Sequence, residues 1–166
     1  MRFNLVLIAT LVTAGAPAFA AGDAAKGEIV FKQCQTCHSV VDDDGKVLAG
    51  KGGKLGPNLF GVFGRQAGTY EGFRYGADIV AAGSAGLIWD ETHFVAYVQN
   101  PAAFLKAQLN DPGAASKMAF KLKDQASAEN VYAYLAQFSP PPVEAPAADG
   151  TAPAADGTAP AATTSP

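Results

Sequence analysis

The chain reads Cys34-Gln35-Thr36-Cys37-His38 at residues 34–38, and this pentapeptide contains both of its cysteines. The C-x-x-C-H spacing is the one by which a haem is attached covalently to a polypeptide. Each thiol can form a thioether with one vinyl group of the porphyrin, which leaves the adjacent imidazole where a ring nitrogen can ligate the iron. The pentapeptide therefore predicts one haem c, attached through Cys34 and Cys37, with His38 as an axial ligand.

Other interpretations of the two cysteines account for less of the pentapeptide. A thioredoxin-like dithiol or a disulfide gives no role to His38, and the dithiol motif expects a βαβ context. A structural zinc site needs four ligands, whereas the chain has no further cysteine and only one further histidine, His93. We therefore expect His93 to be an ordinary helix or surface residue, and a dithiol or disulfide stays the alternative to haem attachment.

The second axial position of the iron needs a ligand from elsewhere in the chain. One of the two methionines is the initiator, so Met118 is the only candidate for a thioether ligand. A methionine ligand raises the reduction potential of haem iron in His/Met cytochromes. Iron ligated by His38 and Met118 has no open position, which predicts a one-electron carrier and not an enzyme. The alternative is a haem c enzyme or gas binder, such as a peroxidase, with an open sixth position.

The first residues have the pattern of a secretory signal peptide. A positive charge at Arg2 is followed by the apolar run Leu5–Val12 and by the small-x-small pattern Ala18-Phe19-Ala20. A membrane anchor would need about 20 consecutive apolar residues, and threonine, glycine and proline interrupt this run early. We expect residues 1–20 to be a cleaved signal peptide and the mature protein to be periplasmic.

The composition changes after Ser139. Three consecutive prolines are followed by a seven-residue repeat that begins as Ala145-Pro146-Ala147-Ala148-Asp149-Gly150-Thr151. Because residues 140–166 contain no aromatic residue and almost no large aliphatic one, they cannot form a core. We expect them to be a disordered, Ala/Pro-rich repeat tail, either passive or used as a tether or docking segment. Residues 21–139 then form one domain.

Helical patterns open and close this domain. The first predicted helix begins at Asp23 as N-cap and carries Gly27, Phe31 and Cys34 on one face. The last begins after Asp124 or Ser127, ends at the prolines and carries an apolar stripe. Glycine weakens a helix, so Gly27 indicates that the last helix crosses closely there. The stripe consists of Val131, Tyr134, Leu135 and Phe138.

Most of the 18 glycines lie between Gly45 and Gly86, in a stretch with little periodicity. Its scattered aliphatic and aromatic residues need an apolar surface to cover, and a porphyrin face supplies one. The run Gly50–Lys54 lacks the order of a phosphate-binding loop. Two further helices are predicted, one from Asp90 to Gln99 and a short one from Asn100-Pro101 to Leu105.

Taken together, these pieces resemble a class I c-type cytochrome of the bacterial cytochrome c2 group, a relative of mitochondrial cytochrome c. The resemblance spans residues 22–139. It implies an all-α fold, the class I cytochrome c fold, with three to five helices and long glycine-rich loops around one covalent haem. Besides residues 34–38, it rests on Gly56-Pro57-Asn58-Leu59, Gly61-Val62-Phe63-Gly64-Arg65, Trp89, Tyr97-Val98-Gln99-Asn100-Pro101 and Lys117-Met118-Ala119-Phe120.

The resemblance also implies roles for residues around the haem. The backbone carbonyl of Pro57 would fix the orientation of His38, opposite the Met118 ligand. A haem buries carboxylates that need donors, and further cofactor contacts are implied at five positions. Arg65, Tyr75 and Trp89 would surround the propionates, Tyr97 would approach the ligating sulfur, and Phe120 would lie at the haem edge.

Charge distribution suggests the kind of partner. The chain is acidic overall, with a formal net charge of −3, and nothing in it suggests binding to nucleic acid. Four lysines are nevertheless expected near the Met118 side, either as a docking face for an acidic patch or as a solvated surface. We expect a monomer, and the resemblance implies that it carries electrons from a cytochrome bc1-type complex to a terminal oxidase or photosynthetic reaction centre. The lysines are Lys106, Lys117, Lys121 and Lys123.

Overall fold

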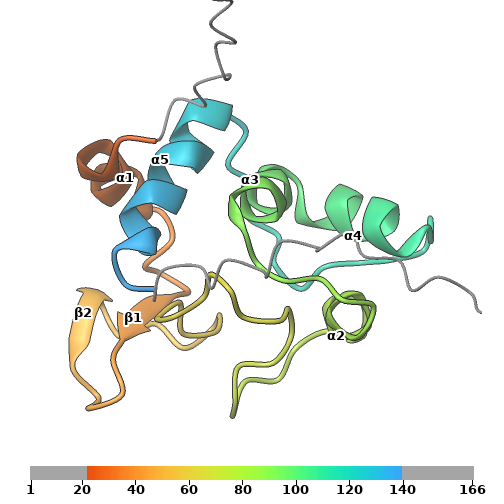
Figure 1. Cartoon of the computed structure of the whole chain (residues 1–166), viewed down its shortest axis with the longest axis horizontal. Helices are drawn as coiled ribbons and strands as arrows, with labels where there is room; N and C mark the ends of the chain where they lie inside the picture. Colours follow the sequence, from red (N-terminus) through yellow and green to blue (C-terminus); the bar gives the residue numbers. More distant parts are fainter. Residues whose placement is uncertain (1–21, 140–166) are drawn as a thin grey trace, which may run out of the picture.

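The structure, a computed structural model, describes residues 22–139. The predicted signal peptide and repeat tail lie outside the described residues. Within this range the chain forms five helices and one two-stranded antiparallel sheet (Figure 1). None of these helices is long and apolar enough to cross a membrane. The elements are α1 (Ala24–Phe31), β1 (Ser39–Val41), β2 (Val47–Gly50), α2 (Ala77–Ser84), α3 (Glu91–Gln99), α4 (Pro101–Leu109) and α5 (Gln125–Ala136).

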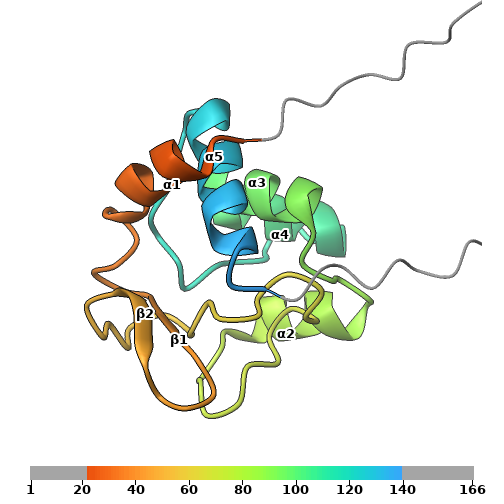
Figure 2. The same cartoon turned by 60° about the vertical axis from the view of Figure 1, so that its left-hand side comes forward.

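The first and last helices cross as the glycine at position 27 predicts (Figures 1 and 2). Helix α1 begins where the Asp23 carboxylate accepts hydrogen bonds from the backbone N–H groups of Ala25 and Lys26, at 3.0 and 3.1 Å. A Cβ atom at Gly27 would meet the backbone carbonyl of Asn130 and, at 2.7 Å, the Cβ of Tyr134. The two helix backbones are therefore in contact at a point where no side chain fits.

Helix α3 packs against α5, and α4 packs against α3. The Asp90 side chain caps α3 by accepting from the N–H of His93 at 2.8 Å, so the predicted helix from Asp90 to Gln99 is confirmed. Asn100 caps α4, which begins with Pro101 at its first turn. This helix continues past the predicted end at Leu105 to Leu109, because Asn110 stops it with a left-handed backbone, φ 50°.

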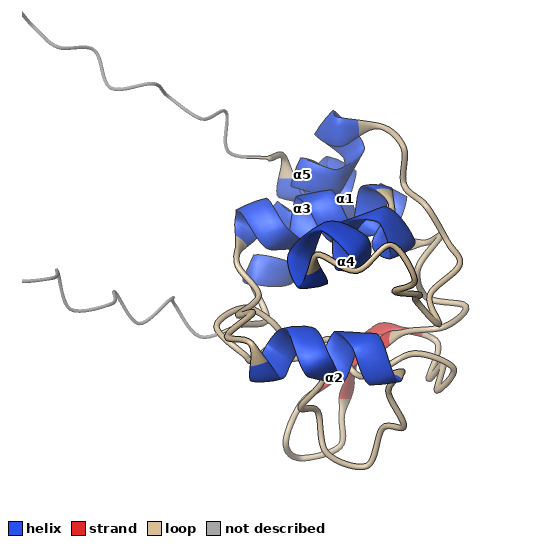
Figure 3. Ribbon diagram, turned by 90° about the vertical axis from the view of Figure 1, so that its right-hand side faces the viewer, coloured by secondary structure: helices blue, strands red, loops and turns tan. Residues whose placement is uncertain are grey.

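The sequence patterns did not indicate the hairpin or α2. Strands β1 and β2 are antiparallel, with Val40 opposite Ala49 and an irregularity between Val40 and Val41. Figure 3 shows α2 apart from α1, α3 and α5 and joined to the rest by loops. Its nearest helix is α4.

The buried core joins all these elements. The largest fully buried side chains include Leu87, Leu105, Leu135, Val40 and Val131, from the segment before α3, from α4, α5 and β1. Aromatic rings also pack in the core. Phe63 contacts Phe94 edge-on, with 5.2 Å between the ring centroids. The glycine-rich stretch thus contributes Phe63 to the same core as the helices.

Candidate functional site

The pentapeptide follows α1 as a series of tight turns. The N–H of Cys34 donates to the carbonyl of Phe31 at 2.8 Å, and the N–H of His38 donates to the carbonyl of Cys34 at 2.9 Å. Neither cysteine is in a disulfide, and Cys37 is exposed whereas Cys34 is partly buried. Burial, with a smaller effect of nearby Cys37, raises the pKa of the Cys34 thiol to about 11. These turns keep Cys34, Cys37 and His38 within one short, hydrogen-bonded segment of the chain.

The His38 ring is fixed by the segment that begins at Gly56. Its Nδ1 lies 2.8 Å from the backbone carbonyl oxygen of Pro57. A carbonyl can only accept, so Nδ1 carries the proton and Nε2 keeps its lone pair. Among the described residues no hydrogen bond reaches Nε2. Burial lowers the pKa of His38, an effect that the Pro57 hydrogen bond partly opposes, which favours the neutral ring that ligates metals.

Gly56 and Asn58 hold this segment in place, and pattern reasoning gave neither a structural role. A Cβ atom at Gly56 would lie on the His38 ring, 2.6 Å from Nδ1 and Nε2. The Asn58 amide donates to the carbonyl of Val41 at 2.7 Å and accepts from the N–H of Val41 at 2.9 Å. The hairpin and the His38 support are therefore one hydrogen-bonded unit.

Met118 lies partly buried in a loop between α4 and α5, residues 110–124, which we term the Met118 loop. The Met118 N–H donates to the Ser116 hydroxyl oxygen at 3.1 Å, and this oxygen is 3.1 Å from the Tyr97 hydroxyl. Tyr97 is therefore linked to Met118 through Ser116, a residue that the sequence patterns did not single out. Burial raises the pKa of Tyr97, which keeps its hydroxyl protonated and able to donate.

Two further contacts hold the Met118 loop to the start of α2. The N–H of Ala115 donates to the Asp78 carboxylate at 2.8 Å. The Lys117 ammonium donates to the carbonyls of Arg74 and Tyr75, each at 3.0 Å. Lys117 is exposed, and its ammonium also joins the Met118 loop to the segment before α2.

Arg65 lies near both Trp89 and Tyr75. The backbone N–H of Trp89 donates to the Arg65 carbonyl at 3.0 Å, and the Arg65 guanidinium donates to the carbonyls of Phe60 and Asn58 at 3.1 and 3.0 Å. Burial lowers the pKa of Arg65, while the nearby Tyr75 opposes this shift. Trp89 also meets Tyr97 edge-on at 5.0 Å, so this cluster is continuous with the contacts of the Met118 loop.

Comparison with known proteins identifies the family. A cytochrome c-551 of Roseobacter denitrificans is 50% identical over 139 residues, which are 84% of this chain and 97% of the relative. A cytochrome c2 of Cereibacter sphaeroides is 50% identical over 140 residues, 82% of this chain and 97% of the relative. The chain belongs to the cytochrome c2 family. No protein-family model matches it.

Solved structures agree with this assignment. Cytochrome c2 from Rhodobacter sphaeroides superposes with a TM-score of 0.70 and 53% sequence identity, covering 71% of this chain and 97% of that one. The class I cytochrome fold is therefore confirmed. As a cytochrome of this family, the chain is an electron-transfer protein with one covalent haem c, and it is not an enzyme.

The described residues fit this cofactor. Two unpaired thiols lie at the C-x-x-C-H spacing, and His38 presents an Nε2 that no described group occupies. The Met118 thioether is the one other soft donor in the described range. Phe120, implied at the haem edge, is 39% exposed.

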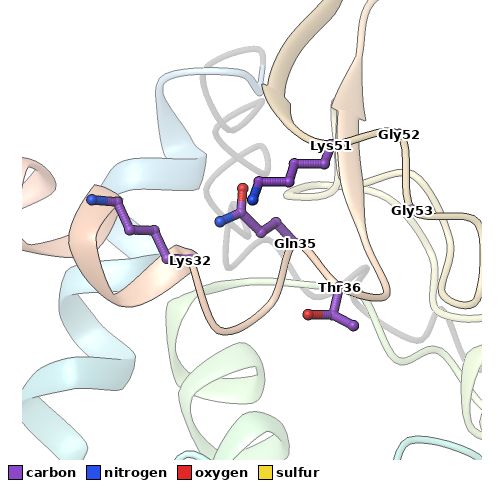
Figure 4. A pocket seen from close by; sticks show the side chains of 6 residues that line it. All are labelled: Lys32, Gln35, Thr36, Lys51, Gly52 and Gly53. Carbon is purple, nitrogen blue, oxygen red and sulfur yellow. The ribbon is translucent and has the colours of Figure 1, made fainter.

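Two groups of exposed lysines lie on the surface of the cytochrome. Lys121 and Lys123 are exposed in the Met118 loop, and Lys106 is exposed in α4. A second group, which sequence reasoning missed, lines a hollow of about 360 Å³ beside the pentapeptide. Figure 4 shows the Gln35 side chain between those of Lys32 and Lys51 there.

Proposed function

We propose that this cytochrome is a soluble periplasmic carrier that moves single electrons from a cytochrome bc1-type complex to a terminal oxidase or a photosynthetic reaction centre. In the proposed site, Cys34 and Cys37 attach the haem and His38 and Met118 are its axial ligands. When bound, haem iron with two strong axial ligands accepts and releases one electron without an open coordination position.

The hydrogen bond from His38 Nδ1 to the Pro57 carbonyl carries this proposal. It fixes the tautomer, it sets the plane of the ring, and it increases the basicity of Nε2 as a ligand. The Gly56 backbone lies against the ring and limits its tilt. A ligand held in this way changes its geometry little between two oxidation states, which favours rapid electron transfer.

Residues near Met118 and around Arg65 also contribute to the proposed site. Ser116 holds the backbone of Met118, and Tyr97 holds Ser116, so the thioether is kept at one place in the loop. The Arg65 guanidinium has donors beyond those it gives to Phe60 and Asn58. With Tyr75 and Trp89 it is proposed to neutralise and hydrogen-bond the propionates, which otherwise would be costly to bury.

A ferric-state spectrum combined with intact mass tests the assignment of the site. We expect a mass that includes one haem and lacks residues 1–20, and the weak far-red absorption of ferric haem with a methionine ligand. The alternative, a haem enzyme or gas binder, predicts an open position instead. Ready binding of carbon monoxide by the wild-type ferrous protein would refute His38/Met118 ligation.

The exposed lysines are proposed to form the docking surface for acidic patches on the membrane complexes. Lys106, Lys121 and Lys123 contribute from α4 and the Met118 loop. Lys32 and Lys51 extend positive charge to the pentapeptide, where Cys37 is exposed. Such charges raise the association rate and make it sensitive to salt.

Charge reversal at single lysines tests this surface. We expect Lys121→Glu or Lys123→Glu to slow electron transfer with membranes containing the donor and acceptor complexes about tenfold at low salt. The matched control is Lys46→Glu, in the hairpin turn, which changes the net charge equally. Equal electron-transfer rates for all three variants would refute the proposed docking surface. Lys117 is not suitable, because its replacement also releases the carbonyls of Arg74 and Tyr75.

A further inference from the structure

A hollow of about 450 Å³ lies where the end of α5 meets the β1–β2 hairpin and the loop after Asn58. Much of its lining is apolar, although it lies at the surface. Leu48, a large aliphatic residue of β2, is 36% exposed there. Its volume is in the range of about 300 to 1,000 Å³ that small-ligand sites have. The lining residues are Asp43, Leu48, Phe60, Gln137, Phe138 and Ser139.

The chain leaves α5 at the rim of this hollow. The carbonyl of Phe138 accepts from the N–H of Gly61 at 2.9 Å. The Ser139 hydroxyl oxygen accepts from the N–H of Phe63 at 3.3 Å. Ser139 is both the last described residue and a lining residue, so the described part of the chain ends at the hollow.

The next residues are Pro140-Pro141-Pro142-Val143. Prolines have no N–H group to satisfy and lose little conformational entropy when they are fixed against a surface. In the polyproline conformation these four residues would extend about 12 Å, at about 3.1 Å per residue. An apolar segment of that length could cross the hollow from the end of α5 to the hairpin.

We propose that residues 140–143 dock in this hollow, with Val143 against Leu48 and Phe60, and so attach the end of α5 to the hairpin. The repeats, which begin at Ala145, would then leave the domain on its hairpin side. A tethered segment has an effective concentration in the millimolar range, which a second copy of the chain at micromolar concentration cannot match. The segment of the chain itself is therefore the favoured occupant.

Two truncations of the haem-loaded mature protein test this docking. A chain ending at Glu144 keeps the docking segment, and a chain ending at Ser139 lacks it. We expect trypsin cleavage after Lys46, in the hairpin turn, to be about fivefold faster in the chain ending at Ser139 than in the other two. Cleavage after Lys121 and Lys123, in the Met118 loop, is the internal control and should not change. Equal cleavage after Lys46 in all three chains would overturn the proposal.

Substitutions in β2 test the contact in the full mature chain. Leu48 lines the hollow, whereas its neighbour Val47, 49% exposed, does not. We expect Leu48→Asp to accelerate cleavage after Lys46 as the truncation does, and Val47→Asp to do so less. In the reduced protein, nuclear Overhauser effects should connect the Val143 methyl groups to Leu48 and Phe60. Random-coil shifts for Val143, or signals around the hollow that change with protein concentration, would show that the segment does not occupy it.

Discussion

The α1–α5 crossing and the Met118 loop are held by different kinds of interaction. At the crossing, two helix backbones are in contact at Gly27, and buried Phe31, Val131 and Leu135 surround them. In the Met118 loop, only Ala114 and Leu122 are buried, and the other described contacts are single hydrogen bonds through Ala115, Lys117 and Ser116. Regions with few buried contacts open at a lower free energy than the global unfolding. The loop that is proposed to supply the methionine ligand can therefore open while the helix pair stays closed.

The largest expected effect on stability comes from adding a side chain where α1 and α5 cross. Gly27→Ala places a Cβ against the Asn130 carbonyl and Tyr134, both on α5. Because backbone atoms cannot move aside without separating the helices, we expect a loss of about 3 kcal/mol in the free energy of unfolding. Thermal unfolding of the haem-loaded protein measures it, with the midpoint lowered by about 10 °C. Glu28→Ala, on the exposed side of the same helix, is the control. Equal midpoints for the two variants would mean that the helices do not cross closely at Gly27.

Removing the proposed ligand should change redox behaviour more than stability. Met118→Leu keeps a similar apolar volume and removes the sulfur. We expect the reduction potential to fall by an appreciable part of the roughly 0.8 V range that axial ligands span, and ferrous iron to bind carbon monoxide. The global unfolding midpoint should change little, because the α1–α5 contact is intact. An unaltered potential would assign the sixth ligand to another group. Ile29→Leu, at an exposed position of α1, is the control.

The sequence patterns predicted the crossing better than the loop. Gly27 weakens an otherwise favourable helix, and the apolar stripe from Val131 to Phe138 needs an apolar partner. The spacing of these residues was therefore enough to predict both helices and their contact. The Met118 role, by contrast, came from its being the one available thioether and from family resemblance. Ser116 gave no signal, because a serine in a loop has many possible partners and only the fold brings Tyr97 to it.

Helix α2 and the hairpin were missed for physical reasons. Gly76 starts α2 without a side-chain cap, and Gly83 lies inside it, so local propensity is weak. The structure explains Gly83, since a Cβ there would meet the Ala67 carbonyl. The hairpin strands are three and four residues long and irregular at Val40 and Val41, too short for an alternating pattern to be seen.

A smaller effect is expected from the hydrogen bonds that join Tyr97 to Met118. Ser116→Ala removes the acceptor of the Met118 N–H and the partner of the Tyr97 hydroxyl, whereas Tyr97→Phe leaves the first of these bonds in place. We expect the free energy of opening the loop to fall by about 2 kcal/mol for Ser116→Ala and about 1 kcal/mol for Tyr97→Phe. Amide hydrogen exchange at Met118 measures both. If Tyr97→Phe had the larger effect, the hydroxyl would act on the ligand by another route.

The smallest expected effect lies where the two regions meet, at Asp124, the residue that ends the Met118 loop and caps α5. Hydrogen bonds from the side chain and the backbone N–H of Ser127 lower the pKa of Asp124 below its ordinary value of 3.8. A lowered folded-state pKa gives stability that is complete above 3.8 and is lost as the pH falls through the lower value. Asp124→Asn keeps a capping side chain without this titration, so its unfolding midpoint should fall less steeply with acid than that of the wild type. Asp44→Asn, in the exposed hairpin turn, is the control. Because the cap fixes α5 and not the methionine, the reduction potential at neutral pH should be unchanged. A shifted potential would mean that the two regions are coupled through Asp124.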